Sequence, residues 1–562
     1  MGALFRSSQP ATAGLFLSLL TLSSSVMAFA SVELVVDINP GPADSKPVEL
    51  TRFGDKLYLS AVGESGNRSL WALDTDPLGV TVLTDVNEVT DVFGFTVYDD
   101  RLFFSADSPA AGRELWASDG APVNTALFKD LAPGSSDGSP GYLDVGAGHL
   151  FFEADFGLWR SDGTVSGTSA LSDASGYQPQ HPRNFIPVGG FELFTSRGET
   201  GREVLYISNG TQTGTITIQD LHTLRLTQGY GTFVPIGDEV FFTARERVIG
   251  GPMNELHQML YRTDGTEAGT AVIKELNITS SGWTSVVAEL NGHAILTVPK
   301  SVSQEELWIS DGTDAGTQLL KDLTQGESDA SIEQFASVEN RAFFSVVQPD
   351  SPAANELWIT DGTSAGTQNI MTFLPGLYDH VDIESIMGFG DRAAFVVSYD
   401  KLFADTFPRR QEYYRELWLS DGTQAGTFPV FVSGIEGSQL QILGVFDNQL
   451  YFRGASASNG LGEELYRLSI PQLPGDLNGD GFVGIGDLNL LLAGWNKTAL
   501  PGDLAAGDAT GDGFVGIADL NLILGNWNTG TPPASGGTAV PEPTTCLLVF
   551  GGLVLAIHRR AV

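Results

Sequence analysis

Two twelve-residue segments near the C-terminal end carry oxygen-bearing side chains at the spacing of a calcium loop. They span residues 476–487 and 508–519, and each has glycine at its sixth position. Calcium takes about six to eight hard oxygen ligands, which such loops supply from positions 1, 3, 5, 7 and 12. The expected ligands are Asp476, Asn478, Asp480, Phe482 and Asp487 in the first loop, and Asp508, Thr510, Asp512, Phe514 and Asp519 in the second. The spacing therefore predicts two Ca²⁺ sites, with the phenylalanines ligating through their carbonyls.

The two loops differ from an ideal EF-hand loop in ways that bear on affinity. Position 12 is Asp rather than Glu in both, which shortens its bidentate reach. Position 9 is Gly484 or Gly516, so water is expected there. Thr510 is a poorer ligand than Asn478, and the second site is expected to be the weaker one. The alternative is a pair of Asp- and Gly-rich turns without metal, but the duplication favours metal.

An apolar segment follows each loop and predicts a helix, over Asp487–Trp495 and over Asp519–Trp527. Two prolines, at 471 and 474, preclude the regular helix that would precede the first loop of an ordinary EF-hand. The tandem arrangement over residues 474–528 resembles the type I dockerin. That resemblance implies calcium binding and docking onto a cohesin, often within polysaccharide-degrading assemblies.

The dockerin resemblance is stronger for calcium than for the partner. In that family, loop positions 10 and 11 hold small, hydroxylated residues that recognise the cohesin. Here these positions are Ile485-Gly486 and Ile517-Ala518. A cohesin-like partner is therefore the weaker of the two expectations.

The rest of the chain must be organised by a repeat. The phrase Glu-Leu-Trp-x-Ser-Asp-Gly-Thr-x-x-Gly-Thr is nearly complete at 306–317, 356–367 and 416–427, and degraded copies precede and follow it. Nine aromatic anchors mark the copies, namely Trp71, Trp116, Trp159, Tyr206, Tyr261, Trp308, Trp358, Trp418 and Tyr466. Eight intervals cover 395 residues, so the mean period is about 49, which indicates a repeat architecture.

Each repeat reads as about four short strands joined by tight turns, with no convincing helix. Neighbouring residues such as Leu115 and Trp116, or Phe103 and Phe104, are both apolar and leave opposite faces of a strand. Both faces must then be buried, which a two-layer sandwich does not require. The predicted fold is mainly β, a β-propeller of about nine four-stranded repeats over residues 31–470, followed by the small helical calcium module.

The N-terminal segment Val32–Pro40 matches the last strand of a repeat, as in Leu127–Pro133, yet precedes every other repeat element. The final repeat ends near Ile470 without such a strand. We therefore expect the first strand to complete the last repeat and close the ring. The longest insertions, Arg245–Met259 and Lys401–Glu416, are the best candidates for a functional rim.

The repeat phrase itself resembles the ELWxxDGT-repeat family of bacterial surface proteins, over roughly residues 31–470. The resemblance implies a secreted repeat protein and says little about activity. The Ser-Asp-Gly-Thr part predicts a hairpin turn, because Gly accepts positive φ and Asp bonds nearby backbone. A single active site needs no ninefold copy, so the phrase is interpreted as scaffold.

The two ends of the chain predict export. Residues 1–30 have Arg6, an apolar run and the cleavage pattern Ala28-Phe29-Ala30, as in a signal peptide. After a linker at 529–540, residues 541–562 hold Pro-Glu-Pro, a short apolar run and a basic end. This order resembles the PEP-CTERM sorting signal, which implies transient anchoring and an exosortase-type enzyme. The expected location is the cell envelope or the medium.

The composition of the chain excludes some classes of function. The net charge of −38 argues against nucleic acid, and the one cysteine, Cys546, rules out disulfide staples within the chain. The seven histidines form no recognisable metal pair, and Gly134–Gly138 fits a nucleophile motif without the helix it needs. The leading hypothesis is a non-catalytic propeller that binds carbohydrate or protein. Alternatives are a polysaccharide hydrolase or lyase, and a purely structural envelope protein.

Overall fold

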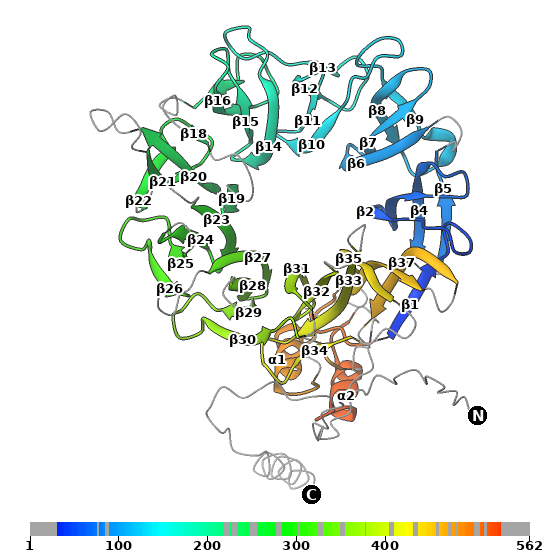
Figure 1. The fold of residues 1–562 in the computed structure, drawn as a ribbon, viewed down its shortest axis with the longest axis vertical. Coiled ribbons are helices and arrows are strands. Elements are labelled where there is room, and N and C mark those ends of the chain that lie inside the picture. Colours follow the sequence, from blue (N-terminus) through cyan, green and yellow to red (C-terminus); the bar gives the residue numbers. More distant parts are fainter. Residues whose placement is uncertain are drawn as a thin grey trace, which may run out of the picture. The chain divides into compact units, whose positions relative to one another are not determined.

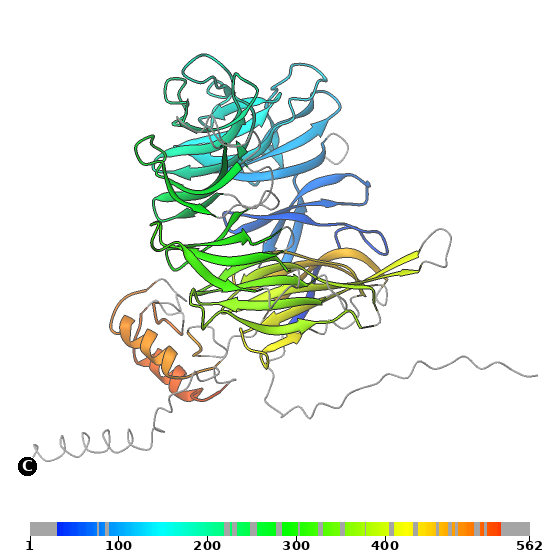
Figure 2. The ribbon, with the colours of Figure 1, turned by 60° about the vertical axis from the view of Figure 1, so that its left-hand side comes forward.

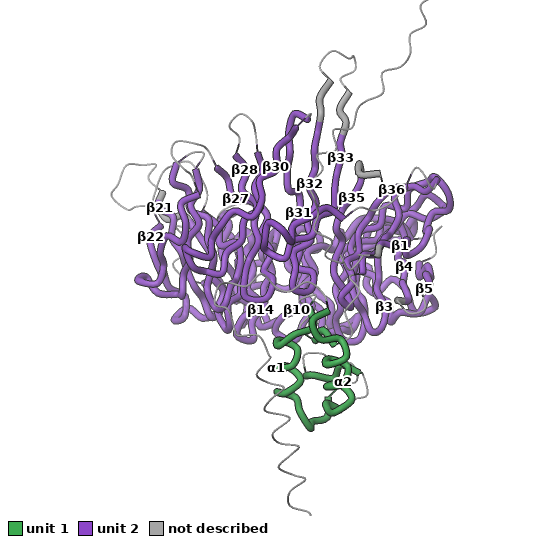
Figure 3. Tube along the Cα trace, turned by 90° about the horizontal axis from the view of Figure 1, so that it is seen from below, with its two compact units in different colours: residues 1–29, 471–562 green, residues 30–470 purple. Residues whose placement is uncertain are grey.

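The computed structural model describes residues 31–75, 78–84, 89–218, 225–226, 233–247, 256–276, 284–301, 304–323, 330–348, 354–376, 378–403, 410–430, 436–456, 460–469, 475–477, 482–499, 506–510 and 514–529. The chain divides into two compact units, residues 30–470 (unit 2) and residues 1–29 with 471–562 (unit 1), coloured separately in Figure 3. The predicted signal peptide and sorting tail lie outside the described residues. Among the described residues, no helix combines the length and apolarity needed to cross a membrane.

In its described part, unit 2 is built from nine sets of four antiparallel strands, which confirms the four strands expected per repeat. Six sets are separate sheets, two are joined in one eight-stranded sheet, and one has an additional strand, β18 (Arg225–Leu226). The sets follow one another around a common centre, with the first strand of each set nearest to it (Figures 1 and 2).

The strands fall into four classes by their place in a set. The first strands are β2 (Val48–Phe53), β6 (Thr90–Tyr98), β10 (Gly141–Gly146), β14 (Gln180–Val188), β19 (Phe233–Ile236), β23 (Ser285–Leu290), β27 (Ser331–Val338), β31 (His380–Phe389) and β35 (Glu436–Phe446). The second strands are β3 (Lys56–Val62), β7 (Arg101–Ser108), β11 (His149–Ala154), β15 (Phe191–Arg197), β20 (Glu239–Arg247), β24 (His293–Pro299), β28 (Arg341–Gln348), β32 (Arg392–Phe403) and β36 (Gln449–Ser456).

The third strands contain the Glu-Leu-Trp part of the repeat phrase, and the fourth strands are the outermost of each set. The third strands are β4 (Arg68–Thr75), β8 (Gly112–Ser118), β12 (Gly157–Ser161), β16 (Glu203–Ser208), β21 (Leu256–Thr263), β25 (Glu305–Ser310), β29 (Ala354–Thr360), β33 (Arg410–Ser420) and β37 (Leu461–Ser469). The fourth strands are β5 (Leu78–Val82), β9 (Ala126–Lys129), β13 (Ser169–Ala170), β17 (Ile216–Thr217), β22 (Ala271–Leu276), β26 (Gln318–Asp322), β30 (Gln368–Phe373), β34 (Thr427–Pro429) and β1 (Ser31–Val36). A 3-10 turn, Pro122–Asn124, precedes β9.

The second and third strands are buried on both faces, as their unbroken apolar runs predict. Phe103 and Phe104 are fully buried, and so is Leu115, while Trp116 is almost so. Phe103 packs in one hydrophobic cluster and Phe104 in another, on either side of the same strand. Successive sets therefore share their cores, and the hydrophobic burial that stabilises one set depends on its neighbours.

The expected pairing of the N-terminal strand with the last repeat is confirmed. Strand β1 pairs antiparallel with β37 in the sheet order β1-β37-β36-β35. Beyond it, the Ile38 N–H donates to Glu464 Oε2 at 3.0 Å, and the Ser45 hydroxyl donates to the same oxygen at 2.7 Å. Burial raises the pKa of Glu464 to about 7. The first and last parts of unit 2 are thus joined by strand pairing and by a buried carboxyl group.

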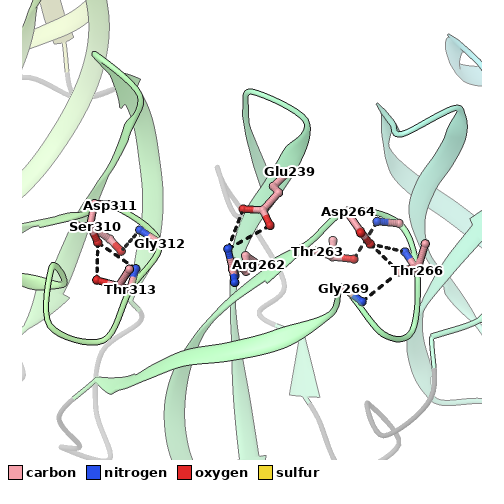
Figure 4. Close-up of polar contacts among 11 residues, drawn as sticks. Glu239, Arg262, Thr263, Asp264, Thr266, Gly269, Ser310, Asp311, Gly312 and Thr313 are labelled. Carbon is pink, nitrogen blue, oxygen red and sulfur yellow. Dashed lines mark hydrogen bonds and ion pairs between the residues drawn. The ribbon is translucent and has the colours of Figure 1, made fainter.

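The Ser-Asp-Gly-Thr turn is stabilised by hydrogen bonds within the motif. In the copy that follows β25, Gly312 has a φ of 85° and its N–H donates to Ser310 Oγ at 3.1 Å. Both the N–H and the hydroxyl of Thr313 donate to Asp311 Oδ1, and the Thr313 bond holds the pKa of Asp311 below its usual range. The copy at Asp264 has the same bonds (Figure 4). The side chains of Ser310, Asp311 and Thr313 thus form hydrogen bonds within their own turn, which agrees with the interpretation of the motif as scaffold.

The second glycine of the phrase is required for a steric reason, and this gives a first prediction. A Cβ on Gly316 would lie 2.0 Å from Asp311 Oδ1. We expect Gly316→Ala to break this turn and to lower the free energy of unfolding of unit 2 by about 2 kcal/mol. The neighbouring exposed change Ala315→Ser is the control and is expected to stay within about 0.5 kcal/mol. Equal denaturation curves for the two variants would contradict this role for Gly316.

The near-complete copies add one more internal bond. In each, the Trp indole N–H donates to the Glu two residues earlier, at 3.0 Å for Trp308 and Glu306 and at 2.8 Å for Trp358 and Glu356. The Glu and Trp lie on the same face of the strand because they are two residues apart. The Glu carboxylate of the phrase therefore accepts a hydrogen bond from the Trp of its own strand.

In unit 1, the two predicted helices are present and begin two residues earlier than expected. Helix α1 spans Ile485–Gly494 and α2 spans Ile517–Gly525. Leu477, Val483, Leu491, Val515 and Ile523 form the small core between them. The two loop–helix halves contact each other in the same way. Val483 of the first loop exchanges backbone hydrogen bonds with residues 528–529, and Val515 of the second loop exchanges them with residues 496–497. Each loop is therefore held by the segment that follows the other helix.

Candidate functional site

In the described part of the first calcium loop, the first and last residues of the loop are both acidic. Asp476 and Asp487 are both buried. Asp487 accepts the Leu477 N–H at 2.7 Å and the Gly484 N–H at 2.7 Å, so the beginning and end of the loop meet at this carboxylate. The predicted ligands Asn478 and Asp480 lie outside the described residues, whereas Phe482 is described and half-buried.

The second loop repeats this arrangement with one difference. Asp519 accepts the Gly516 N–H at 2.8 Å, and it also accepts both the N–H and the hydroxyl of Thr510, at 2.8 and 2.9 Å. Asp508 is fully buried. The structure thus brings Asp508, Thr510 and Asp519 together, while Asp512 lies outside the described residues and Phe514 is exposed.

The donor set of the two loops fits a hard cation. Aspartate oxygens are the ligands that calcium prefers, and buried carboxylates are stabilised by metal coordination. Within the described ranges, no cluster of three or more His, Cys, Asp or Glu side chains forms around a single point. The carboxylates that calcium would join are those of Asp476 and Asp487 in one loop, and of Asp508 and Asp519 in the other.

Calcium binding gives a second prediction. A fragment of residues 474–530 is expected to gain helical circular dichroism when Ca²⁺ is added, and to lose it with a chelator, because metal binding and folding are coupled. Calorimetry on the full chain is expected to show two sites. Asp487→Asn should remove the tighter one and Asp519→Asn the weaker one, each lowering affinity tenfold or more, whereas the exposed Asn489→Ala should change neither. Unchanged dichroism would contradict the metal assignment.

In unit 2, a second candidate lies where the second strand of each set turns into the third. We call this the 2–3 edge; the first strands also begin there, because neighbouring strands are antiparallel. In the joined sheet, the 2–3 turn is Asp155-Phe156, and both residues have positive φ. Tyr142, next to the beginning of β10, also has positive φ, at 53°. Both aromatic rings are displayed, with 56% of Tyr142 and 63% of Phe156 exposed.

Polar side chains lie beside these two rings. His181 Nδ1 is 3.1 Å from Glu153 Oε1, and its ring packs edge-on against Phe156 at 5.4 Å between centroids. The Arg183 guanidinium lies over the Tyr142 ring, 5.7 Å from its centroid. We call Tyr142, Glu153, Phe156, His181 and Arg183 the aromatic–polar cluster. It can offer apolar ring surface, hydrogen-bond donors and a carboxylate acceptor to one ligand.

A tyrosine group lies at the same edge of another set. Tyr399 on β32 and Tyr414 on β33 face each other across the strands, and Tyr378 packs against both, at 5.4 and 6.4 Å. These two strands are among the longest of unit 2 and extend beyond their neighbours (Figure 3). The end of β32 and the beginning of β33 lie in the predicted insertion Lys401–Glu416, of which residues 404–409 lie outside the described residues. Burial raises the pKa of Tyr399.

Sequence reasoning found the insertion but missed the aromatic–polar cluster. The copy Phe156-Gly157-Leu158-Trp159 has Gly where the phrase has Glu, but three other copies also lack this Glu, so the substitution alone did not mark the set. The positive φ of Tyr142 is not readable from its residue type, because tyrosine rarely adopts it.

Comparisons with known proteins found similar solved structures only at low identity. No family model matches the chain, and no curated protein matches it. Among solved structures, oligopeptidase B from Leishmania major is similar over 74% of this chain and 54% of its own length, with 10% identity and a TM-score of 0.38. Puromycin hydrolase covers 77%, with 13% identity and a TM-score of 0.34. This chain spans 62% of that hydrolase.

A third similar structure is the β-propeller domain of the Trilobed protease from Pyrococcus furiosus. It covers 69% of this chain and 99% of its own length, at 10% identity and a TM-score of 0.34. These likenesses, with TM-scores below 0.5, carry over neither an activity nor a ligand to this chain. Chemistry in this chain has to be argued from its own residues.

Proposed function

We propose that this chain is an exported, non-catalytic β-propeller of nine blades that binds an extracellular carbohydrate or protein at its 2–3 edge. The observation that carries the proposal is the contrast between repeated and non-repeated residues. Ser310, Asp311, Thr313 and Glu306 are bonded within their own repeat. Exposed rings such as Phe156, which do not recur, gather at one edge with polar neighbours. Conserving the scaffold while varying this edge is how a repeat protein acquires a binding surface.

The proposed number of blades follows from the nine strand sets. The proposed closure of the ring follows from the pairing of β1 with the last set. Nine sets exceed the usual four to eight blades of propellers. Pairing of β1 with β37 supplies the fourth strand of the last set from the other end of the domain. Such an arrangement protects sheet edges and holds the two ends of the ring together.

The C-terminal part is proposed to assemble or anchor this propeller. Two Ca²⁺ ions would order the dockerin-like module, and its position-10 residues, Ile485 and Ile517, are 66% and 65% exposed. Apolar side chains displayed in the same place on two related helices suit a protein partner, which by the resemblance would be cohesin-like. The PEP-CTERM-like tail would add transient membrane anchoring and processing by an exosortase-type enzyme.

A polysaccharide and protein panel tests this proposal. Residues 31–470 are immobilised and offered neutral and acidic polysaccharides and envelope proteins, and both retained ligand and released sugar are measured. We expect retention of one class without release of reducing ends. Released sugar would instead assign a glycoside hydrolase, and unsaturated products would assign a lyase. Absence of any retention would overturn the binding function in favour of a structural role.

A further inference from the structure

The eight-stranded sheet differs from the other sheets of unit 2 because two consecutive sets are joined in it. The third strand of one set, β12, pairs with the first strand of the next, β14, through Gly157 and Gln180. The His181 N–H also donates to the Phe156 carbonyl at 2.7 Å. A Cβ on Gly157 would lie 2.2 Å from Gln178 Nε2, so a larger residue here would have to displace the Gln178 side chain. The glycine thus lets Gln178 lie close to the backbone at the place where the two sets meet.

This junction places the aromatic–polar cluster on one continuous surface. Tyr142 follows Gly141, which pairs with Glu153 on the neighbouring strand. Glu153 contacts His181, and His181 contacts Phe156. Arg183, two residues beyond His181 on the same strand, covers the Tyr142 ring. The five side chains therefore come from three strands and one turn. They form two contacting groups, Glu153–His181–Phe156 and Arg183–Tyr142, which the pairing of Gly141 with Glu153 and the shared strand β14 bring near each other.

The backbone here holds side chains in unfavourable conformations. Tyr142, Phe156 and His181 have φ values of 53°, 63° and 51°. Each such residue costs about 1 kcal/mol or more, and such strain concentrates at ligand sites. Positive φ near the start of the first strand recurs in other sets, at Glu49 and Asp91, and therefore belongs to the scaffold. What distinguishes this sheet is that two of its positive-φ residues, Tyr142 and Phe156, carry exposed aromatic rings, for which a ligand gives a reason.

We propose that the aromatic–polar cluster binds a neutral oligosaccharide, an inference that rests on the binding function proposed above. A sugar ring has an apolar C–H face, which suits the exposed rings of Tyr142 and Phe156, and a rim of hydroxyl groups. Glu153 accepts hydrogen bonds from hydroxyls, Arg183 donates them, and His181 can do either according to its tautomer. The net charge of −38 repels polyanions, so a neutral glycan is favoured over an acidic one.

The test is calorimetry on the full chain with cellohexaose, laminarihexaose and mannohexaose, beside hexagalacturonate as the charged probe. Phe156→Asn and Tyr142→Asn remove a ring but keep a residue that accepts positive φ, so the fold is retained. Arg183→Gln tests the donor without touching a strained position. Val165→Asn, on a Ser-Asp-Gly-Thr turn of the same set and 52% exposed, is the matched control.

We expect the wild type and the Val165 variant to bind one neutral hexaose equally. The Phe156, Tyr142 and Arg183 variants should each bind it at least tenfold more weakly, with melting temperatures no lower than that of the wild type. If the hexaose binds equally to all of these proteins, the site is wrong while the binding function stands. If only hexagalacturonate or a protein from the panel binds, the ligand class is wrong. If nothing binds, both the site and the binding function fall.

Discussion

Removal of residues 32–40 is expected to lower the free energy of unfolding of unit 2 by on the order of 5 kcal/mol. This segment contains most of β1, which pairs with β37 over five register positions. It also contributes Val35 and Ile38, both of which are buried in the cluster shared by the first and last sets. Burial of two such side chains stabilises by about 1.5–3 kcal/mol each, and the strand hydrogen bonds add to this. Opening the ring would also leave β37 as an exposed edge.

Two smaller changes sharpen this experiment. Ile38→Ala alone is expected to cost about 2–4 kcal/mol, because its side chain is enclosed. Glu33→Gln removes an ion pair with Arg467 at the surface of the same strand, and should cost less than about 1 kcal/mol. Chemical denaturation followed by tryptophan fluorescence measures all three. A deletion variant as stable as the wild type would show that β1 does not hold the two ends together.

Replacement of Glu192 by Gln is expected to stabilise the protein at neutral pH. Glu192 is fully buried on β15, and neither carboxyl oxygen has a hydrogen-bond partner in the described part of the chain. Its side chain lies against Gly146 of the preceding set, where a Cβ would be 1.5 Å from Oε2. Burial raises the pKa of Glu192 to about 9, and the nearby Asp144 adds to the rise. The folded protein therefore keeps this group protonated at pH 7.

The pH dependence follows from the direction of this shift. Between the ordinary pKa of 4.5 and about 9, the unfolded chain loses the Glu192 proton while the folded chain keeps it. The folded state then binds more protons, so stability falls as pH rises through this window. Below pH 4.5 the cost disappears. At pH 7 the difference corresponds to about 3 kcal/mol, which Glu192→Gln should recover.

The control is Glu239→Gln, on the second strand of the next set, one residue before the position equivalent to Glu192. Glu239 is partly exposed and pairs with Arg262 at 3.1 Å (Figure 4). Losing this pair should change stability by less than about 1 kcal/mol at any pH. Unfolding free energies measured at pH 4.5 and pH 8 distinguish the cases. A Glu192 variant whose advantage does not grow with pH would show that this carboxyl group is not held protonated.

The features of the fold that could be predicted are those that depend on short stretches of sequence. Adjacent buried residues such as Leu115 and Trp116 required two covered faces, and the displaced first strand was visible because Val32–Pro40 matches a fourth strand. Helix α1 begins before its expected residue because Asp487 lies inside the first turn, where it accepts the Gly484 N–H. The acidic residue was read as the start of the helix, although it serves as the capping residue of the first turn.

The unpredicted part depended on contacts between distant segments. The residue type of Tyr142 does not signal a positive φ, since the bulge at this place comes from strand pairing. The reciprocal bonds of Val483 and Val515 join segments from opposite halves of the module. Which strands of neighbouring sets pair depends on contacts between distant residues, and the candidate site lies where β12 pairs with β14.

The central claim is that the repeat phrase is scaffold and that binding belongs to residues outside it. Its most direct test is one titration series, in which a ligand retained from the panel is titrated into Gly316→Ala and Phe156→Asn, with the melting temperature of each recorded. We predict that Gly316→Ala melts earlier and binds normally, whereas Phe156→Asn melts no earlier than the wild type and binds at least tenfold more weakly. The reverse pattern, with binding lost in Gly316→Ala and retained in Phe156→Asn, would contradict this account.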